Sequence, residues 1–170
     1  KGIDHPGPLL RYVVEMGALM QRENAPGLSA QDVMRPLIAD EDPWVRAVAR
    51  LTRNRMLRAG EQEADIQQAL VEFRSIGERW GISYALATFA DLAARRGDLG
   101  VALDYGEQAA DVLAELGAVE DLVFLRAREA QLRWFVGDET GSAAAMAQAE
   151  EDAASVGWPD AVAGMAYFKA

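Results

Sequence analysis

The stretch 78-ERWGISYALATFADLAARRGDLGVALDYGEQAADVLAELGAVED-121 decides the fold of this 170-residue chain. It predicts one helix, a turn at Gly97-Asp98, a second helix and a stop at Gly117, because glycine tolerates the left-handed backbone that ends many helices. No sustained alternation of apolar and polar residues indicates a strand. The stretch therefore predicts a helical hairpin, and it contains no obvious catalytic group.

The glycines recur at a fixed spacing, which is typical of stacked structural repeats. Gly77, Gly117 and Gly157 are 40 residues apart, and Gly97 and Gly137 lie midway between them. This spacing predicts a helix end every 20 residues along the chain.

Two further features follow the same period. Gly60, in RAGE, fits the place of the midway glycines, with the unit after it shortened by three residues. Alanine stands eight residues before each unit-ending glycine, at Ala69, Ala109 and Ala149. A small side chain at one fixed place lets two helices approach closely, so these alanines predict places of close approach.

Helix signals give a coarse map of the whole chain. Pro8 suits a first helical turn, and Ser29 suits an N-cap. The expected helices span about 8–22, 29–38, 43–59, 63–76, 80–96, 99–116, 120–136 and 142–156, followed by a truncated helix from Pro159.

Several of these helices are apolar on two sides, whereas a surface helix needs a single apolar stripe. In the helix over 120–136, one face carries Val123, Ala127, Ala130 and Trp134, and the nearly opposite face carries Leu125, Leu132 and Val136. A helix that lies between two neighbours needs two such faces. Hairpins that cannot bury both faces alone stack and share one core.

The expected fold is therefore all-α: a right-handed α-α superhelix of about four helical hairpins, with a truncated last helix. We expect one solenoid domain made of a degenerate hairpin (1–42), repeat 1 (43–79), repeat 2 (80–119), repeat 3 (120–158) and the start of a further repeat (159–170).

Composition excludes several classes of function. Asp and Glu number 27 against 17 Lys and Arg, a net charge of -10, so the surface repels nucleic-acid phosphates. The chain has no cysteine and one histidine, His5, which disfavours a metal site. No apolar run approaches the roughly 20 residues that span a bilayer, and no signal peptide is visible. We expect a cytoplasmic fragment of a longer protein, with no cofactor, no membrane contact and no direct nucleic-acid contact.

The repeat pattern resembles the tetratricopeptide repeat, which calls for small residues in its first helix and an alanine-rich second helix. The central unit carries this resemblance through Leu86, Ala90, Gly97, Ala102 and Ala109. The third unit keeps Ala130, Gly137 and Ala149, and the first keeps Gly60 and Ala69. Arg53, Arg126, Arg133 and Ser142 depart from the pattern. The 40-residue period is also longer than the usual 34.

A second resemblance lies in the amino-acid sequence of two segments. DPWVRAVARL (42–51) and ALVEFRSIGERWGISYALATFADLAARRGD (69–98) are similar to the C-terminal repeats of large actinobacterial regulators of the SARP type and the ATP-binding LuxR type. The resemblance implies that DNA-binding and nucleotide-binding domains precede such a region. Neither lies within this sequence, which has no glycine-rich phosphate loop followed by a Lys-Ser/Thr pair.

Catalytic signals are weak. The acidic clusters at 61–63 and 150–152 fall at a turn and on a helix face, where solvated charges are expected. No nucleophile set can be assembled, so we expect no enzyme. Most of the aromatic residues fall at helical spacing, and we expect Phe89 and Trp134 to be core residues.

The resemblance to tetratricopeptide repeats implies a concave groove lined by the first helix of each unit. Aligning the units on their midway glycines projects one polar, aromatic and locally basic face. Its members are Arg50, Asn54 and Arg58; Tyr84, Thr88, Asp91 and Arg95; and Phe124, Arg128, Gln131 and Phe135. We expect the groove to bind an acidic or amphipathic protein segment, and replacement of Arg50, Arg58 and Arg128 by alanine to abolish that binding. An ordinary solvated face is the alternative.

The functional hypothesis is a non-catalytic protein–protein interaction or sensor module of a larger transcriptional regulator. The alternative is a free-standing scaffold or peptide receptor without a DNA-binding domain. The expected partner is a protein or peptide, which includes other domains of the same full-length chain, and the sequence leaves its identity and the oligomeric state open.

Overall fold

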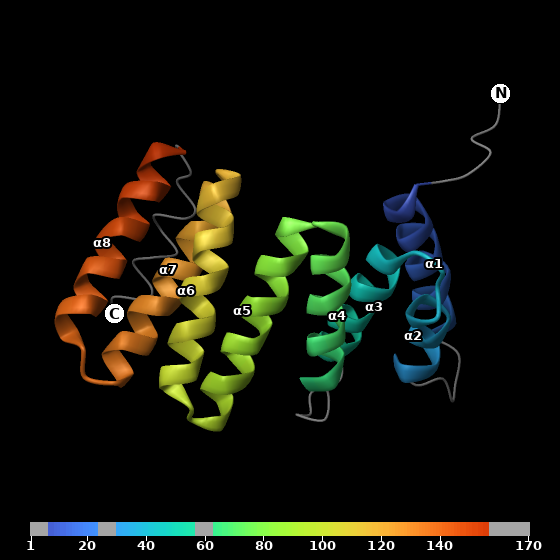
Figure 1. Ribbon diagram of the computed structural model, residues 1–170, viewed down its shortest axis with the longest axis horizontal. Helices are drawn as coiled ribbons and strands as arrows, with labels where there is room; N and C mark the ends of the chain where they lie inside the picture. The colour runs from blue at the N-terminus through green and yellow to red at the C-terminus, as the bar shows by residue number, and fades with distance from the viewer. Residues whose placement is uncertain (1–6, 24–29, 57–62, 157–170) are drawn as a thin grey trace. The chain divides into compact units, whose positions relative to one another are not determined.

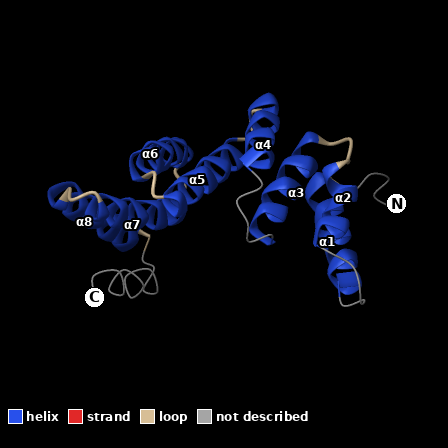
Figure 2. Ribbon diagram, turned by 90° about the horizontal axis from the view of Figure 1, so that it is seen from below, coloured by secondary structure: helices blue, strands red, loops and turns tan. Residues whose placement is uncertain are grey.

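The computed structural model describes residues 7–23, 30–56 and 63–156, and all regular secondary structure in these ranges is helical, as Figure 2 shows. The helices follow one another along the chain (Figure 1). Their bounds are α1 Pro8–Glu23, α2 Ala30–Ile38, α3 Pro43–Met56, α4 Glu63–Ile76, α5 Arg79–Arg96, α6 Leu99–Leu116, α7 Val119–Phe135 and α8 Glu139–Ser155. The all-α prediction is confirmed for these residues.

The glycines end helices at the predicted places. Gly77, Gly97, Gly117 and Gly137 have φ of 68°, 86°, 67° and 83°. At each, the glycine N–H donates to the carbonyl three residues back, and the next residue donates to the carbonyl five back. This pattern satisfies carbonyl groups that the helix leaves open, and it needs a left-handed residue. Gly60, Gly157, Ser29 and the expected last helix lie outside the described residues.

The start of α8 was predicted at Ser142, and this boundary was wrong by three residues. Asp138 is the N-cap, and its side chain accepts a hydrogen bond from the Gly141 N–H at 2.8 Å. Satisfying an N–H of the first turn lets the helix begin at Glu139, before the apolar pattern starts.

The chain divides into an N-terminal unit, residues 1–81, and a C-terminal unit, residues 82–170. The N-terminal unit contains α1 to α4, and its hydrophobic core joins α2 and α3 through Met34, Leu37, Val45 and Ala49. From α1, Tyr12 packs against this core and donates to or accepts from the Thr52 hydroxyl at 2.6 Å. The segment 1–42 thus contributes two helices that pack against α3.

Ion pairs with little exposure join α3 to α4. The Asp65 carboxylate accepts from Arg50 Nη1 at 3.1 Å and from Arg53 Nε at 2.8 Å. Glu72 accepts from Arg46 Nε at 3.0 Å. Both carboxylates are buried, and a buried charge needs a partner of opposite charge. The pairing with Asp65 therefore explains why Arg53 stands where the repeat pattern expects a small residue.

In the C-terminal unit, α7 packs against both α6 and α8. One cluster joins α5, α6 and α7 through Ala93, Ala102 and Leu132. Another joins α7 and α8 through Val123, Ala149 and Ala153. The prediction that the helix over 120–136 buries two faces is confirmed for Val123, Ala127 and Ala130 on one face and for Leu132 on the other, but it was wrong for Val136, which is 47% exposed.

Trp134 is a correction to that prediction. Its side chain is 60% exposed, whereas Phe89 is buried as expected and stacks on Tyr105 with ring centroids 5.1 Å apart. Trp134 lies in the last turn of α7, and α8 begins with Glu139, Thr140 and Gly141. That polar first turn offers no large apolar side chain to cover an indole.

The periodic alanines are buried as predicted. Ala69, Ala109 and Ala149 are each 0% exposed. The hydroxyl of Ser83 on α5 donates to the Ala109 carbonyl on α6 at 3.2 Å, so the two helices lie close together at this position. The alanines therefore mark close approaches between helices. The superhelix, its hand and the four-repeat division stay predictions.

The arginines of α7 that depart from the repeat pattern also have acidic partners. Arg126 pairs with Asp152 on α8, so the expectation of a wholly solvated acidic cluster at 150–152 was wrong for Asp152. Arg133 pairs with Glu129 at 2.7 Å, Asp138 at 3.0 Å and Glu107 of α6 at 2.7 Å. Among the described residues, the helices lack the length and apolar character that a bilayer-spanning segment needs.

Candidate functional site

The residues predicted to line a groove fall in both units. In the N-terminal unit, Arg50 and Asn54 lie on α3, and Arg58 lies outside the described residues. Arg50 is bonded to Asp65, and its Nε lies 3.6 Å from Glu72 Oε2. Its guanidinium is therefore engaged with α4. Replacing Arg50 would leave the buried carboxylates of Asp65 and Glu72 with fewer partners. A loss of binding in such a variant could therefore come from a loss of stability.

In the C-terminal unit, the predicted faces of α5 and α7 meet. Asp91 Oδ1 of α5 lies 3.5 Å from Arg128 Nε of α7. The other members on α5 bond locally: the Thr88 hydroxyl donates to the Tyr84 carbonyl at 2.7 Å, and Arg95 Nε donates to the Asp91 carbonyl at 3.2 Å.

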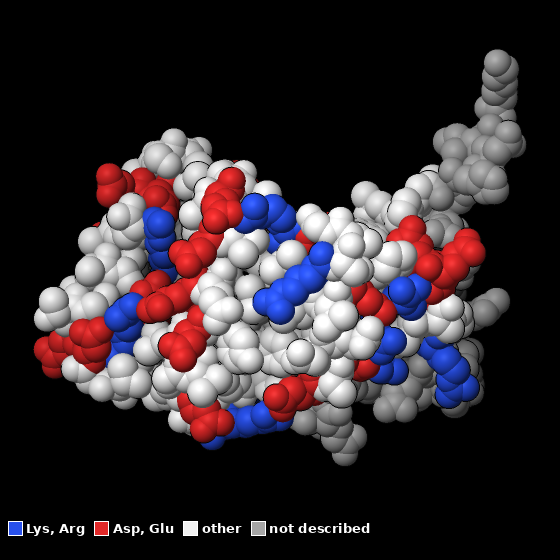
Figure 3. Space-filling model, viewed as in Figure 1, with Lys and Arg blue, Asp and Glu red and all other residues white. Residues whose placement is uncertain are grey.

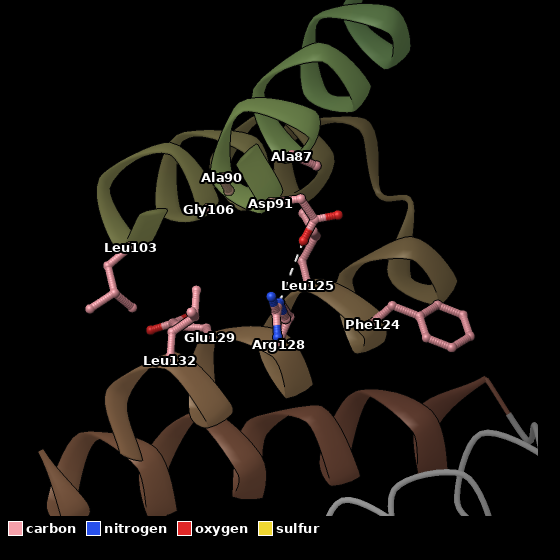
Figure 4. A pocket seen from close by; sticks show the side chains of 10 residues that line it. All are labelled: Ala87, Ala90, Asp91, Leu103, Gly106, Phe124, Leu125, Arg128, Glu129 and Leu132. Carbon is pink, nitrogen blue, oxygen red and sulfur yellow. Dashed lines mark ion pairs between the residues drawn. The ribbon is translucent and has the colours of Figure 1, made fainter. Parts of the chain in front are cut away.

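A pocket of about 220 Å³ opens where α5, α6 and α7 converge (Figure 4). Figure 4 shows Asp91 and Arg128 joined by their ion pair, with Phe124 set to one side of them. Three of the predicted groove residues thus line one pocket. The lining residues are Ala87, Ala90, Asp91, Leu103, Gly106, Phe124, Leu125, Arg128, Glu129 and Leu132.

The walls of the pocket are mostly apolar, and its polar groups are three charged side chains. Arg128 Nη1 also donates to Gln131, one turn further along α7. Glu129 accepts from Arg133 Nε at 2.7 Å. The Arg128 and Asp91 side chains are 38% and 55% exposed, so their ion pair is worth at most about 1 kcal/mol. A ligand can therefore displace that pair at little cost.

A partly exposed stripe runs along α7 beside the pocket. Phe124, Arg128, Gln131 and Phe135 are separated by four, three and four residues, which places them on one face of a helix. The two phenylalanines are 56% and 61% exposed. At 1.5 Å per residue the stripe is about 16 Å long, or three turns.

The pKa values of Arg133 and Asp138, at the end of α7 and the start of α8, are shifted by their neighbours. Hydrogen bonds to Glu129 and then Asp138 raise the pKa of Arg133. The Gly141 N–H, followed by the Arg133 guanidinium, lowers the pKa of the Asp138 carboxyl. Both shifts stabilise the charged forms, whereas a general acid or base needs its pKa moved toward neutrality. No cluster of three or more His, Cys, Asp or Glu among the described residues has the geometry to hold a metal ion.

Sequence reasoning missed the contribution of α6 to the pocket. It aligned the first helices of the units and therefore considered only α5 and α7. Gly106 was the available signal, because a glycine inside a helix costs stability and often has a packing or functional reason. A Cβ placed there would have no atom within 4 Å. Gly106 also lines the pocket.

Comparisons with known proteins give no relative for this chain: no family model, no curated protein and no solved structure matches it.

Proposed function

We propose that this chain is a non-catalytic protein–protein interaction module whose C-terminal unit receives an apolar side chain of a partner segment in the pocket between α5, α6 and α7. The observation that carries the proposal is the pocket itself: apolar walls, a displaceable ion pair at Asp91 and Arg128, and the exposed Phe124 beside it. A buried apolar anchor surrounded by a polar rim is the usual arrangement of an interaction hot spot.

The size of the pocket favours an anchor side chain over a complete small-molecule ligand. Small-molecule sites commonly enclose about 300–1,000 Å³. A cavity of about 150 Å³ already holds benzene. A volume of about 220 Å³ therefore suits one large side chain of a longer segment, with the stripe on α7 available for the rest of it.

We further propose that the chain is a long, degenerate relative of the tetratricopeptide repeat, serving as the sensor or scaffold arm of a larger transcriptional regulator. The helix ends every 20 residues and the buried alanines of each hairpin support the repeat. The regulator rests on sequence resemblance alone. The alternative is a free-standing scaffold or peptide receptor, and the parent gene distinguishes them: an upstream DNA-binding domain with a phosphate-binding loop favours the regulator.

The binding proposal can be tested by panning a peptide library against the whole chain. Gly106→Leu adds a large side chain at a residue that lines the pocket, and its Cβ would meet no neighbouring atom. Gly100→Leu is a matched control on the same helix, also in open space but outside the pocket. Circular dichroism should show that both variants fold. We expect enriched peptides with an apolar anchor that bind the wild type and Gly100→Leu and lose binding to Gly106→Leu. A library that yields no peptide sensitive to Gly106→Leu would refute the proposal.

A further inference from the structure

The negative charge of this chain is concentrated in the C-terminal unit. Residues 1–81 carry 12 Asp and Glu against 11 Lys and Arg, a difference of one. Residues 82–156 carry 14 Asp and Glu against five Arg, a difference of nine. The pocket therefore lies in the unit that holds nearly all of the net charge.

Helix α6, which contributes Leu103 and Gly106 to the lining of the pocket, is itself acidic. Asp104, Glu107, Asp111 and Glu115 are all exposed and are separated by three, four and four residues, so they share one face of α6. Figure 3 shows acidic side chains in a line over this helix. Two of them are the immediate sequence neighbours of the lining residues Leu103 and Gly106.

Three of the five arginines in residues 82–156 are paired with carboxylates, and a fourth, Arg95, donates to the Asp91 carbonyl, so the excess of nine acids remains. Arg126 is paired with Asp152, Arg133 with three carboxylates, and Arg128 with Asp91. Two of the three charged residues that line the pocket are acids. An acidic segment would therefore meet repulsion from the unit as a whole, and a basic segment would be attracted to it.

We infer that the occupant of the pocket is a basic amphipathic helix of another protein, with an apolar anchor residue flanked by lysine or arginine. This inference rests on the proposed function and narrows its partner. The anchor enters between α5, α6 and α7, the apolar side of the helix lies along the three-turn stripe of α7, and its basic side chains face the carboxylates of the unit. Helices that lay an apolar face into a groove are an established mode of recognition.

Two synthetic helical peptides test the sign of the charge. The first repeats leucine at i, i+3, i+4 and i+7 with lysine elsewhere, over about 14 residues, which is about 21 Å of helix. The second keeps every leucine and replaces lysine by glutamate. Fluorescence anisotropy of each labelled peptide is measured with the whole chain at low and high salt. We expect the Leu/Lys peptide to bind, and to bind more weakly as the salt concentration rises.

Variants of the pocket distinguish binding at a specific site from electrostatic attraction to the whole acidic surface. Gly106→Leu is expected to weaken the affinity for the Leu/Lys peptide by at least about tenfold, which is the loss of one hot-spot contact. Gly100→Leu is expected to leave that affinity unchanged. Equal binding to wild type and Gly106→Leu overturns the inference, because the peptide is then held by charge alone. Binding of neither peptide also overturns it.

Failure of this inference is distinguishable from failure of the proposed function. A Leu/Glu peptide that binds better than Leu/Lys and is sensitive to Gly106→Leu overturns the basic partner and leaves the pocket as a protein-binding site. Acidic peptides selected in the library panning would likewise overturn the basic partner alone. If the library yields no peptide whose binding is sensitive to Gly106→Leu, the proposal that the pocket is a binding site is itself refuted.

Discussion

Replacing Asp65 by alanine should destabilise the N-terminal unit strongly, although Asp65 lies in the first turn of α4 and outside the proposed binding pocket. Its carboxylate accepts three hydrogen bonds, one from Arg50 and two from Arg53. The Asp65 side chain is 10% exposed, and those of the two arginines are 20% and 23% exposed. The carboxylate therefore holds two cations that are largely shielded from water.

The size of the effect follows from what each arginine retains. Breaking a buried ion pair commonly costs about 3–5 kcal/mol. Arg50 keeps Glu72 within 3.6 Å, and both guanidinium groups can partly rehydrate at the surface they still expose. We therefore expect Asp65→Ala to lower the free energy of unfolding by about 3 kcal/mol, the lower end of that range.

Glu63→Ala is a matched control because Glu63 is an exposed acid in the same helical turn. Both substitutions remove the favourable interaction of an acid with the helix N-terminus, about 0.3–1 kcal/mol. Asp65→Ala also removes the ion pairs of Asp65 with Arg50 and Arg53 of α3. The difference between the two variants therefore reports those pairs.

Urea unfolding followed by circular dichroism measures both variants, and hydrogen exchange of α3 and α4 localises the loss. A double-mutant cycle with Arg53→Ala should give a coupling above about 1 kcal/mol. Stacked helical hairpins can unfold in stages, so transitions seen by the two probes should be compared. Equal losses for Asp65→Ala and Glu63→Ala, or a coupling below about 0.5 kcal/mol, would refute the reasoning.

Three further substitutions test other parts of the structure. Ala149→Leu should lower the free energy of unfolding in urea by about 1–3 kcal/mol, because it overpacks the contact of α7 with α8. Ala147→Leu, at an exposed position of the same helix, should be nearly neutral. Equal effects of the two substitutions would contradict the close approach. Gly81→Ala should lower the melting temperature because its methyl group meets the ring of a buried phenylalanine of α4, whereas Gly100→Ala in open space should be neutral or raise it; the reverse order would argue against this packing. Asp138 has a lowered pKa, so its stabilising contribution is present above the ordinary carboxyl pKa of about 3.9 and is lost as the pH falls through the folded value. The urea midpoint of Asp138→Asn should therefore fall less steeply than that of the wild type as the solution is acidified below about pH 4, and parallel curves would rule this role out.

The fold was largely predictable because its signals are local. A helix end at a glycine depends on the backbone freedom of one residue and on carbonyls a few positions back, so Gly97 and Gly117 could be recognised without any tertiary information. The buried alanines were predictable for a related reason, since a fixed place in a repeated unit meets the same neighbour each time. The predicted core position of Trp134 was wrong: its side chain is 60% exposed, and the next helix, α8, begins with a polar first turn.

The candidate site was predictable only in part. Asp91, Phe124 and Arg128 were named from the alignment of first helices, and they meet at one pocket. Arg50 was named by the same alignment, but its guanidinium is bonded to α4. Helical periodicity states which residues share a face. It does not state which acid on a neighbouring helix will engage a cation on that face.

By itself, the sequence determined the helices, their ends and the small residues between them, because these depend on backbone conformation and on the volume of single side chains. Tertiary structure alone decided which arginines pair across helices, as Arg50 and Arg53 of α3 do with Asp65 of α4, and it alone formed the pocket. A pocket is the space left when three helices converge, and its walls come from residues such as Ala87, Gly106 and Leu132, which lie far apart along the chain. No local interaction encodes that convergence, so only the packed helices reveal it.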